Sequence, residues 1–241
     1  MGTSVGERII VALDTPDKQQ ALTIARAIAP VINKVKVGME LFYSQGPSVL
    51  EELQQLGVQV FLDLKVHDIP NTAAGAAASL SRHGVWMWNV HAAGGKQMME
   101  RAREAADQAC AKLGIVRPLL IAVTQLTSTS QQVMEEEIGI REPIADTVVR
   151  YAQMAQEAGL DGVVASAQEV PYIKQHCGAS FLTVTPGIRM PDSQADDQVR
   201  VTSPKQALEL GTDYMVIGRN ITNAADPLEA AKAIIRSTDT L

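Results

Sequence analysis

Short apolar segments alternate with longer amphipathic segments along the whole of this 241-residue chain. Short apolar runs between turn residues are typical of buried strands, and apolar residues three and four apart are typical of helices. The predicted strands are 8–13, 34–37, 58–64, 86–91, 118–124, 162–165, 181–185 and 214–217. The predicted helices are 18–29, 47–56, 72–82, 96–113, 144–158, 168–176, 204–210 and 227–235. Eight strand-then-helix units in a chain of this length predict an α/β fold, a single TIM (β/α)8 barrel.

The length also suits one undivided domain. Barrels of this class commonly reach this size without splitting, and no linker or low-complexity segment interrupts the pattern. We therefore expect residues 1–241 to form one TIM-barrel domain. A doubly wound open sheet is the alternative fold, and it typically has fewer strands.

Composition excludes several classes of partner. The formal net charge is −6 and the basic residues are scattered, which argues against nucleic-acid binding. Cys110 and Cys177 lie far apart without a C-x-x-C pattern, which favours free thiols in a reducing compartment. No segment approaches 18 uninterrupted apolar residues, so no membrane span is expected. These features predict a cytoplasmic protein with neither a membrane nor a nucleic acid as partner.

Charged residues gather where the predicted strands end. Asp14 follows the first strand, Lys36 lies on the second, Asp63 and Lys65 end the third, and Asp68 comes just beyond it. In a TIM barrel, functional groups occupy the C-terminal ends of the strands. Strand side chains alternate between faces, so Asp63 and Lys65 point the same way. A structural salt-bridge network would also explain such charges, but five of them at strand ends favour an active site.

A second group of residues predicts phosphate binding. Gly218 and Arg219 follow the last strand, where TIM barrels frequently hold phosphate. The glycine lets backbone N–H groups approach the phosphate, and the guanidinium offers a bidentate contact. A turn with a surface charge is the alternative interpretation. The polar segment 190–200 is either a lid over the catalytic face or a surface loop. No His, Asp or Glu grouping has metal-ligand spacing, so no metal is predicted.

Several sequence blocks together resemble one enzyme family across nearly the whole chain. They are 11–14, 36–38, 63–72, 89–95, 124–128, 185–189, 197–200 and 218–219. Their order and spacing are similar to those of the bacterial type of orotidine 5′-phosphate decarboxylase. The resemblance implies a cofactor-free conversion of orotidine 5′-monophosphate (OMP) to uridine 5′-monophosphate (UMP) and CO2, the last step of de novo pyrimidine synthesis.

The resemblance also implies roles for individual residues. Lys36, Asp63, Lys65 and Asp68 would form a charged tetrad, with Lys65 as proton donor. The enzyme would be a homodimer whose sites each take Asp68, Ile69 and Thr72 from the neighbouring chain. The remaining substrate contacts would come from Asp14 with Lys36 at the ribose, Thr127 and Ser128 at the nucleotide, and Pro186, Arg189, Gln198, Gly218 and Arg219 around the phosphate.

Two other functions remain open from the sequence. A Mg²⁺-dependent sugar-phosphate decarboxylase or aldolase of the same superfamily would share the D-x-K-x-x-D core, although segments 69–72 and 126–128 argue against it. A non-catalytic nucleotide-binding protein on the same barrel is the alternative from a different class. The intact set of charged residues argues against that second alternative.

Overall fold

Eight parallel strands close into a barrel in sequence order. The structure is a computed structural model, and it describes residues 4–190 and 201–238. The strands are β1 (Ile9–Ala12), β2 (Lys34–Gly38), β3 (Gln59–Val66), β4 (Met87–His91), β5 (Leu119–Val123), β6 (Gly162–Val164), β7 (Leu182–Thr185) and β8 (Tyr214–Ile217). Pairing of β1 with β8 completes the ring. The predicted TIM barrel is therefore confirmed, and the open-sheet alternative is wrong.

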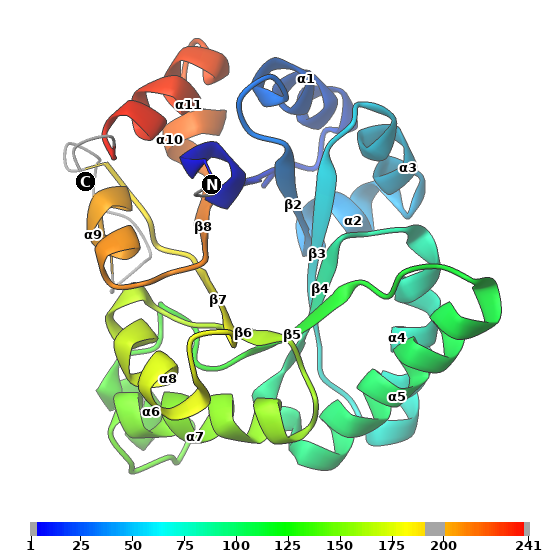
Figure 1. Cartoon of the computed structure of the whole chain (residues 1–241), viewed down its shortest axis with the longest axis vertical. Helices are drawn as coiled ribbons and strands as arrows, with labels where there is room; N and C mark the ends of the chain where they lie inside the picture. The colour runs from blue at the N-terminus through cyan, green and yellow to red at the C-terminus, as the bar shows by residue number, and fades with distance from the viewer. Residues whose placement is uncertain (1–3, 191–200, 239–241) are drawn as a thin grey trace.

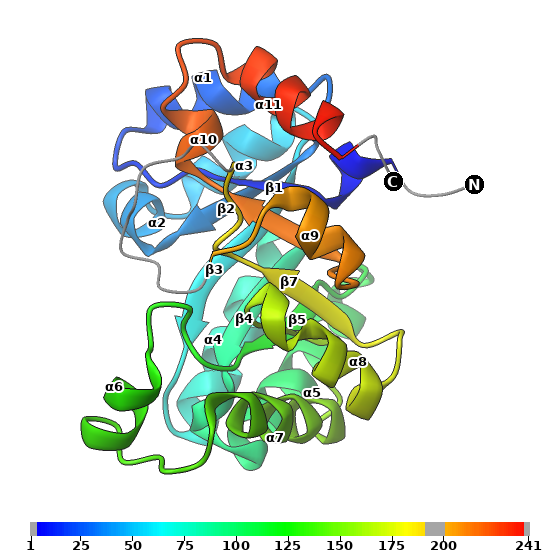
Figure 2. The ribbon, with the colours of Figure 1, turned by 90° about the vertical axis from the view of Figure 1, so that its left-hand side faces the viewer.

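Helices surround this barrel, as Figure 1 shows. Those predicted are α1 (Lys18–Ile28), α3 (Ser48–Gln55), α4 (Pro70–Leu80), α5 (Lys96–Leu113), α7 (Ile144–Glu157), α8 (Val170–Cys177), α9 (Pro204–Glu209) and α11 (Pro227–Arg236). Three short helices were not predicted: α2 (Met39–Gln45), α6 (Gln131–Glu136) and α10 (Arg219–Thr222). These three follow β2, β5 and β8, and in the side view of Figure 2 they lie at the end of the barrel toward which the strands run.

Side chains at the helix starts explain where several helices begin. Asp17 accepts hydrogen bonds from the backbone N–H groups of Gln19 and Gln20 at the start of α1. Asp226 does the same for Leu228 and Glu229 at the start of α11. A cap of this kind contributes about 1 kcal/mol, because it satisfies donors that have no partner within the helix.

The core has two layers because strand residues alternate between the two faces of the sheet. Inside the barrel, Ile10, Phe61, Met87, Ile121 and Val184 belong to a small buried cluster. Outside it, a much larger cluster joins the strands to the helices. The fully buried Trp88 lies in this outer layer, and its indole N–H has no acceptor among the described residues. The tryptophan thus packs between strand and helices.

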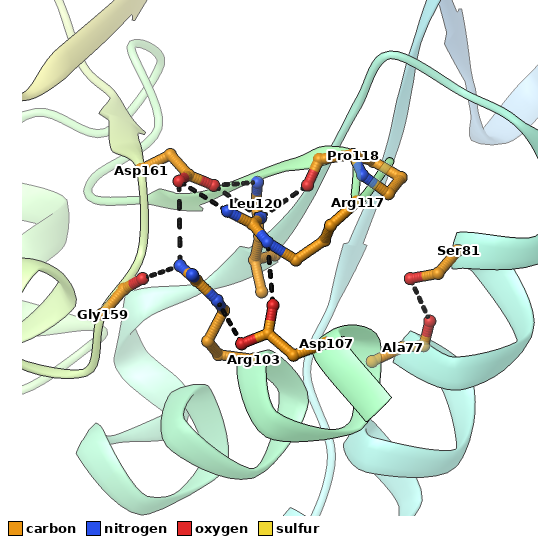
Figure 3. Close-up of polar contacts among 9 residues, drawn as sticks. All are labelled: Ala77, Ser81, Arg103, Asp107, Arg117, Pro118, Leu120, Gly159 and Asp161. Atoms are coloured by element: carbon orange, nitrogen blue, oxygen red, sulfur yellow. Dashed lines mark hydrogen bonds and ion pairs between the residues drawn. The ribbon is translucent and has the colours of Figure 1, made fainter. Parts of the chain in front are cut away.

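The N-terminal ends of β5 and β6 carry a network of ion pairs that joins them to α5 (Figure 3). Arg117 makes two hydrogen bonds of 2.8 Å with the carboxylate of Asp161. Asp161 also accepts the backbone N–H of Leu120 at 2.7 Å, and Asp107 bridges Arg117 and Arg103 at 3.0 and 2.9 Å. Residues at this N-terminal end of a TIM barrel serve stability, whereas active sites occupy the opposite end. We therefore assign these charges to the fold.

Candidate active site

A cavity of about 890 Å³ opens at the C-terminal ends of the strands. This volume lies in the range of small-molecule sites. Apolar side chains of the inner layer, including Phe61 and Val216, form part of its wall. Among the predicted site residues, those that line the cavity are Asp14, Lys36, Asp63, Lys65, Thr127, Ser128, Pro186, Arg189, Gly218 and Arg219. Barrel closure thus brings together residues that lie more than 200 positions apart in the chain.

Four of these residues form a chain of alternating charges. The Nζ atom of Lys36 lies 2.8 Å from Oδ1 of Asp14 and 3.4 Å from Oδ2 of Asp63. The Nζ atom of Lys65 lies 2.9 Å from Oδ1 of Asp63. Lys36 and Asp63 are buried, whereas the side chain of Asp14 is 59% exposed. The deepest carboxylate is therefore enclosed by two ammonium groups.

This enclosure determines the protonation states. Burial alone would raise the pKa of Asp63, but Lys36 and Lys65, together with a hydrogen bond from Asn89, lower it below the ordinary value. Burial alone would lower the pKa of Lys36, but Asp63 and Asp14 outweigh it and raise the pKa. Opposite charges favour the ionised form of each partner. At neutral pH the Asp63 carboxylate is therefore ionised, with the protonated Lys36 beside it.

Lys65 has an unusual backbone conformation. Among the described residues it is the only non-glycine residue with a positive φ angle, at 52°. The pairing of β3 with β4 shifts register there, since Leu62 pairs with Trp88 but Val66 pairs with Val90. A left-handed conformation costs a non-glycine residue about 1 kcal/mol or more, so the surrounding contacts must hold it.

Asn89 supplies such a contact and has no role in the sequence-based prediction. It lies in the block 89–95 that carries the family resemblance, yet only the structure shows what it touches. Its Oδ1 accepts the backbone N–H of Lys65 at 2.8 Å, and its Nδ2 donates to Oδ1 of Asp63 at 2.7 Å. Gln125, Leu126, Asn220 and Asn223 also line the cavity without having been predicted.

Four predicted residues are not part of the cavity wall described for this chain. Asp68, Ile69 and Thr72 are exposed, at the end of β3 and the start of α4, and none of them lines the cavity. The Asp68 carboxylate accepts the backbone N–H of Ile69 at 2.7 Å. Gln198 lies outside the described residues, as do the block 197–200 and nearly all of the segment 190–200, for which the sequence left a lid and a surface loop as alternatives.

A second hollow, of about 670 Å³, lies beside the exposed segment that follows β3. Its wall includes Met39, Tyr43, Val66 and His67, and Lys65 contributes to both hollows. Met39 and Tyr43 are 44% and 69% exposed. This side of the barrel mouth therefore presents apolar surface to its surroundings.

Other expectations from composition can be compared with the described residues. Cys110 and Cys177 are both free, as predicted, and the structure shows that both are buried. Within 4–190 and 201–238, no three His, Cys, Asp or Glu side chains converge in a way that would hold a metal ion. Over the same ranges no helix combines the length and apolar character needed to cross a membrane.

A closed parallel barrel with an ionised Lys–Asp–Lys group at its C-terminal face has the architecture of a TIM-barrel enzyme. Residues 7–234 match the model of the orotidine 5′-phosphate decarboxylase / HUMPS family. The chain belongs to this family.

Relatives and solved structures agree with this assignment. Orotidine 5′-phosphate decarboxylase of Syntrophomonas wolfei is 52% identical over 95% of this chain and 96% of its own length. That of Bacillus caldolyticus is 55% identical over 92% of this chain and 90% of its own. The crystal structure of the Lactobacillus acidophilus enzyme is 41% identical, with a TM-score of 0.84 over 97% of this chain and all of that one. The Pyrococcus horikoshii structure, at 26% identity, has a TM-score of 0.76 over the same shares.

Proposed function

We propose that this chain decarboxylates OMP to UMP and CO2, the last step of de novo pyrimidine synthesis, without a cofactor. The observation that carries the proposal is the Asp14–Lys36–Asp63–Lys65 chain of charges in the cavity. Membership of the family and relatives that bear this name support it. We further propose that residues 1–241 act as one domain and that the enzyme is cytoplasmic.

The reaction explains why an ammonium group is needed. When the bond from C6 to the carboxylate breaks, its electron pair remains in an in-plane orbital that the π system of the ring cannot delocalise. Without an electron sink, catalysis depends on a charge placed where the negative charge develops. Lys65 is the proposed source of that charge, and its ammonium then donates a proton to C6. Its side chain is 24% exposed, so solvent can restore the proton afterwards.

Asp63 has a different proposed role. Its lowered pKa keeps it ionised, so a substrate carboxylate bound beside it meets a like charge. The repulsion disappears as neutral CO2 leaves, which means that it disfavours the bound substrate more than the transition state. Lys36 holds Asp63 and Asp14 together, and the exposed Asp14 is available to the ribose hydroxyls.

The phosphate end of the substrate would lie where the segments that follow β7 and β8 reach the cavity. Arg189, Gly218 and Arg219 line the cavity there. TIM barrels frequently bind phosphate at this place. We propose that these residues, with Pro186 and Gln198, hold the phosphate, while Thr127 and Ser128 contact the nucleotide. Binding energy from this remote group can stabilise the geometry required at C6.

We also propose that the site is completed by a second copy of the chain. Asp68, Ile69 and Thr72 are exposed and do not line the cavity of their own chain. Residues that complete the site of a partner chain must be exposed in this way. Ile69 is 66% exposed and comes two residues after His67, which lines the second hollow together with Met39 and Tyr43. Exposed apolar groups of this kind mark interaction surfaces. In a two-fold symmetric dimer both sites would be completed at once.

A direct assay tests the proposed function. Purified protein is mixed with OMP, and the loss of the orotate absorbance is followed with and without EDTA. We expect turnover in both samples. Turnover that EDTA abolishes would indicate a metal-dependent member of the superfamily, and UMP binding without turnover would indicate a nucleotide-binding protein.

A further inference from the structure

Asn89 is a fully buried polar residue that faces the inside of the barrel. Side chains of β4 alternate, so Met87 and Asn89 point inward while Trp88 packs in the outer layer. Asn89 does not line the cavity, and no substrate contact is assigned to it. Its amide reaches across to β3 instead.

Two hydrogen bonds of opposite direction define how this amide is placed. Nδ2 donates to Oδ1 of Asp63 at 2.7 Å, and Oδ1 accepts the backbone N–H of Lys65 at 2.8 Å. A carboxylate only accepts and a backbone N–H only donates, so the amide fits in a single orientation. The same Asp63 oxygen contacts the Lys65 ammonium at 2.9 Å. One side chain thus holds the carboxylate and the backbone of the lysine that contacts it.

The break in strand pairing explains why a side chain is needed here. Between Leu62 and Val66, β3 advances four residues while β4 advances two, from Trp88 to Val90. The bulge removes Lys65 from the regular ladder and leaves it in the left-handed conformation. The Asn89 carbonyl then takes the place of a backbone acceptor for its N–H. The position of the ammonium therefore depends on a hydrogen bond from the neighbouring strand.

We infer that Asn89 is a positioning residue for decarboxylation: its amide holds the Asp63 carboxylate and the Lys65 bulge in the arrangement that the reaction uses. This inference rests on the proposed function, because it concerns the same site. Asn89 acts on the substrate through Asp63 and Lys65 only. A misplacement of about 1 Å in such a group costs about a hundredfold in rate.

Two substitutions separate the two hydrogen bonds. Asn89→Asp keeps an acceptor for the Lys65 N–H but replaces the donor to Asp63 by a carboxyl group. Burial and the Asp63 carboxylate at hydrogen-bond distance raise the pKa of the new carboxyl, against the opposite effect of the Lys36 and Lys65 ammonium groups on Asp63. The new carboxyl donates only when lower pH protonates it. Asn89→Leu removes both hydrogen bonds at every pH. Thr183→Val is the matched control, because Thr183 is equally buried but bonds to Asp213, outside the site.

The measurement is kcat of each variant divided by kcat of the wild type at the same pH, which cancels ionisation of the substrate. For Asn89→Asp we expect this ratio to fall at least about tenfold between about pH 5.5 and pH 8.5, as the donor is lost. For Asn89→Leu we expect a pH-independent loss of about a hundredfold, with the Kd for UMP changed less than about threefold. The Thr183→Val ratio should stay near one. A pH-independent ratio for Asn89→Asp, at any level, overturns the inference, and this variant decides alone if the leucine variant does not fold.

Hydrogen exchange of the Lys65 amide gives a second readout that needs no turnover. Asn89→Asp keeps an acceptor for the Lys65 N–H, whereas Asn89→Leu removes it. The leucine variant is therefore the informative one. In Asn89→Leu the Lys65 amide should exchange faster than in the wild type, while the Leu120 amide, bonded to Asp161, should not change. An unchanged Lys65 amide overturns the inference. If the wild type leaves OMP untouched, the proposed function fails, and exchange still decides whether Asn89 positions Lys65.

Discussion

Replacing Lys65 by alanine should abolish decarboxylation while leaving the protein folded. The Lys65 ammonium lies 2.9 Å from Asp63, which keeps two other partners, Lys36 at 3.4 Å and Asn89 at 2.7 Å. Asp63 is therefore not left as an unpaired buried charge. The loss of one charged hydrogen bond costs about 1–3 kcal/mol of stability.

The expected effect on the rate is larger than the effect on stability. Two unit charges about 4 Å apart interact by about 4 kcal/mol at an effective dielectric constant of about 20. Each 1.4 kcal/mol corresponds to about a factor of ten, so losing this stabilisation of the carbanion lowers kcat about a thousandfold. Loss of the proton donor lowers it further. Binding of UMP should persist, because Arg219 and Asp14 at the cavity wall are unchanged.

The assay follows OMP absorbance, with UMP affinity and thermal unfolding measured on the same samples. Lys96→Ala is the matched control, because Lys96 makes a 2.9 Å ion pair with Glu157 on the exposed surface. Exposed ion pairs contribute little, so this variant should keep full activity. If folded Lys65→Ala retains more than about a hundredth of the wild-type kcat, the role of Lys65 as charge stabiliser and proton donor is refuted.

Three further predictions concern the rest of the site. Arg219→Ala should lower kcat/KM for OMP far more than for orotidine without phosphate, and equal losses would place Arg219 elsewhere. Mixing inactive Lys65→Ala and Asp68→Ala chains should restore about a quarter of wild-type activity, because half of the randomly formed dimers hold one intact site. The shared site would be contradicted by a mixture that stays inactive after its dimers dissociate and reassociate, while wild type taken through the same treatment keeps its activity. Because the pKa of Asp63 is lower in the folded state, its stabilising contribution is present above about pH 4 and is lost as pH falls through the folded pKa. The free energy of unfolding of the wild type should therefore fall more steeply than that of Asp63→Asn below about pH 4, as urea unfolding would measure, and parallel curves would contradict the lowered pKa.

Much of the fold could be predicted from the sequence because buried parallel strands are almost uniformly apolar. The alternation of such runs with amphipathic helices located all eight strands, and β8 has the predicted bounds. Helices α2, α6 and α10 were missed, and their four to seven residues show a helical period only weakly.

The sequence also indicated which side chains would share the barrel mouth. Placing Asp14, Lys36, Asp63 and Lys65 at strand ends required only the alternation of strand side chains and the rule that parallel strands end at one face. The cavity contains all four. The roles of these residues in catalysis remain predictions for the experiments above.

Contacts across the barrel depended on the tertiary structure. The β3 bulge, the left-handed Lys65 and the Asn89 amide that joins Asp63 to Lys65 follow from a register shift between two strands. Register is set by packing of both strands against the rest of the barrel, so neither strand's own sequence specifies it. Local sequence therefore determined which residues reach the site. Only barrel closure and strand pairing decided the distances and ionisation states at which they meet, because these depend on neighbours distant in the chain.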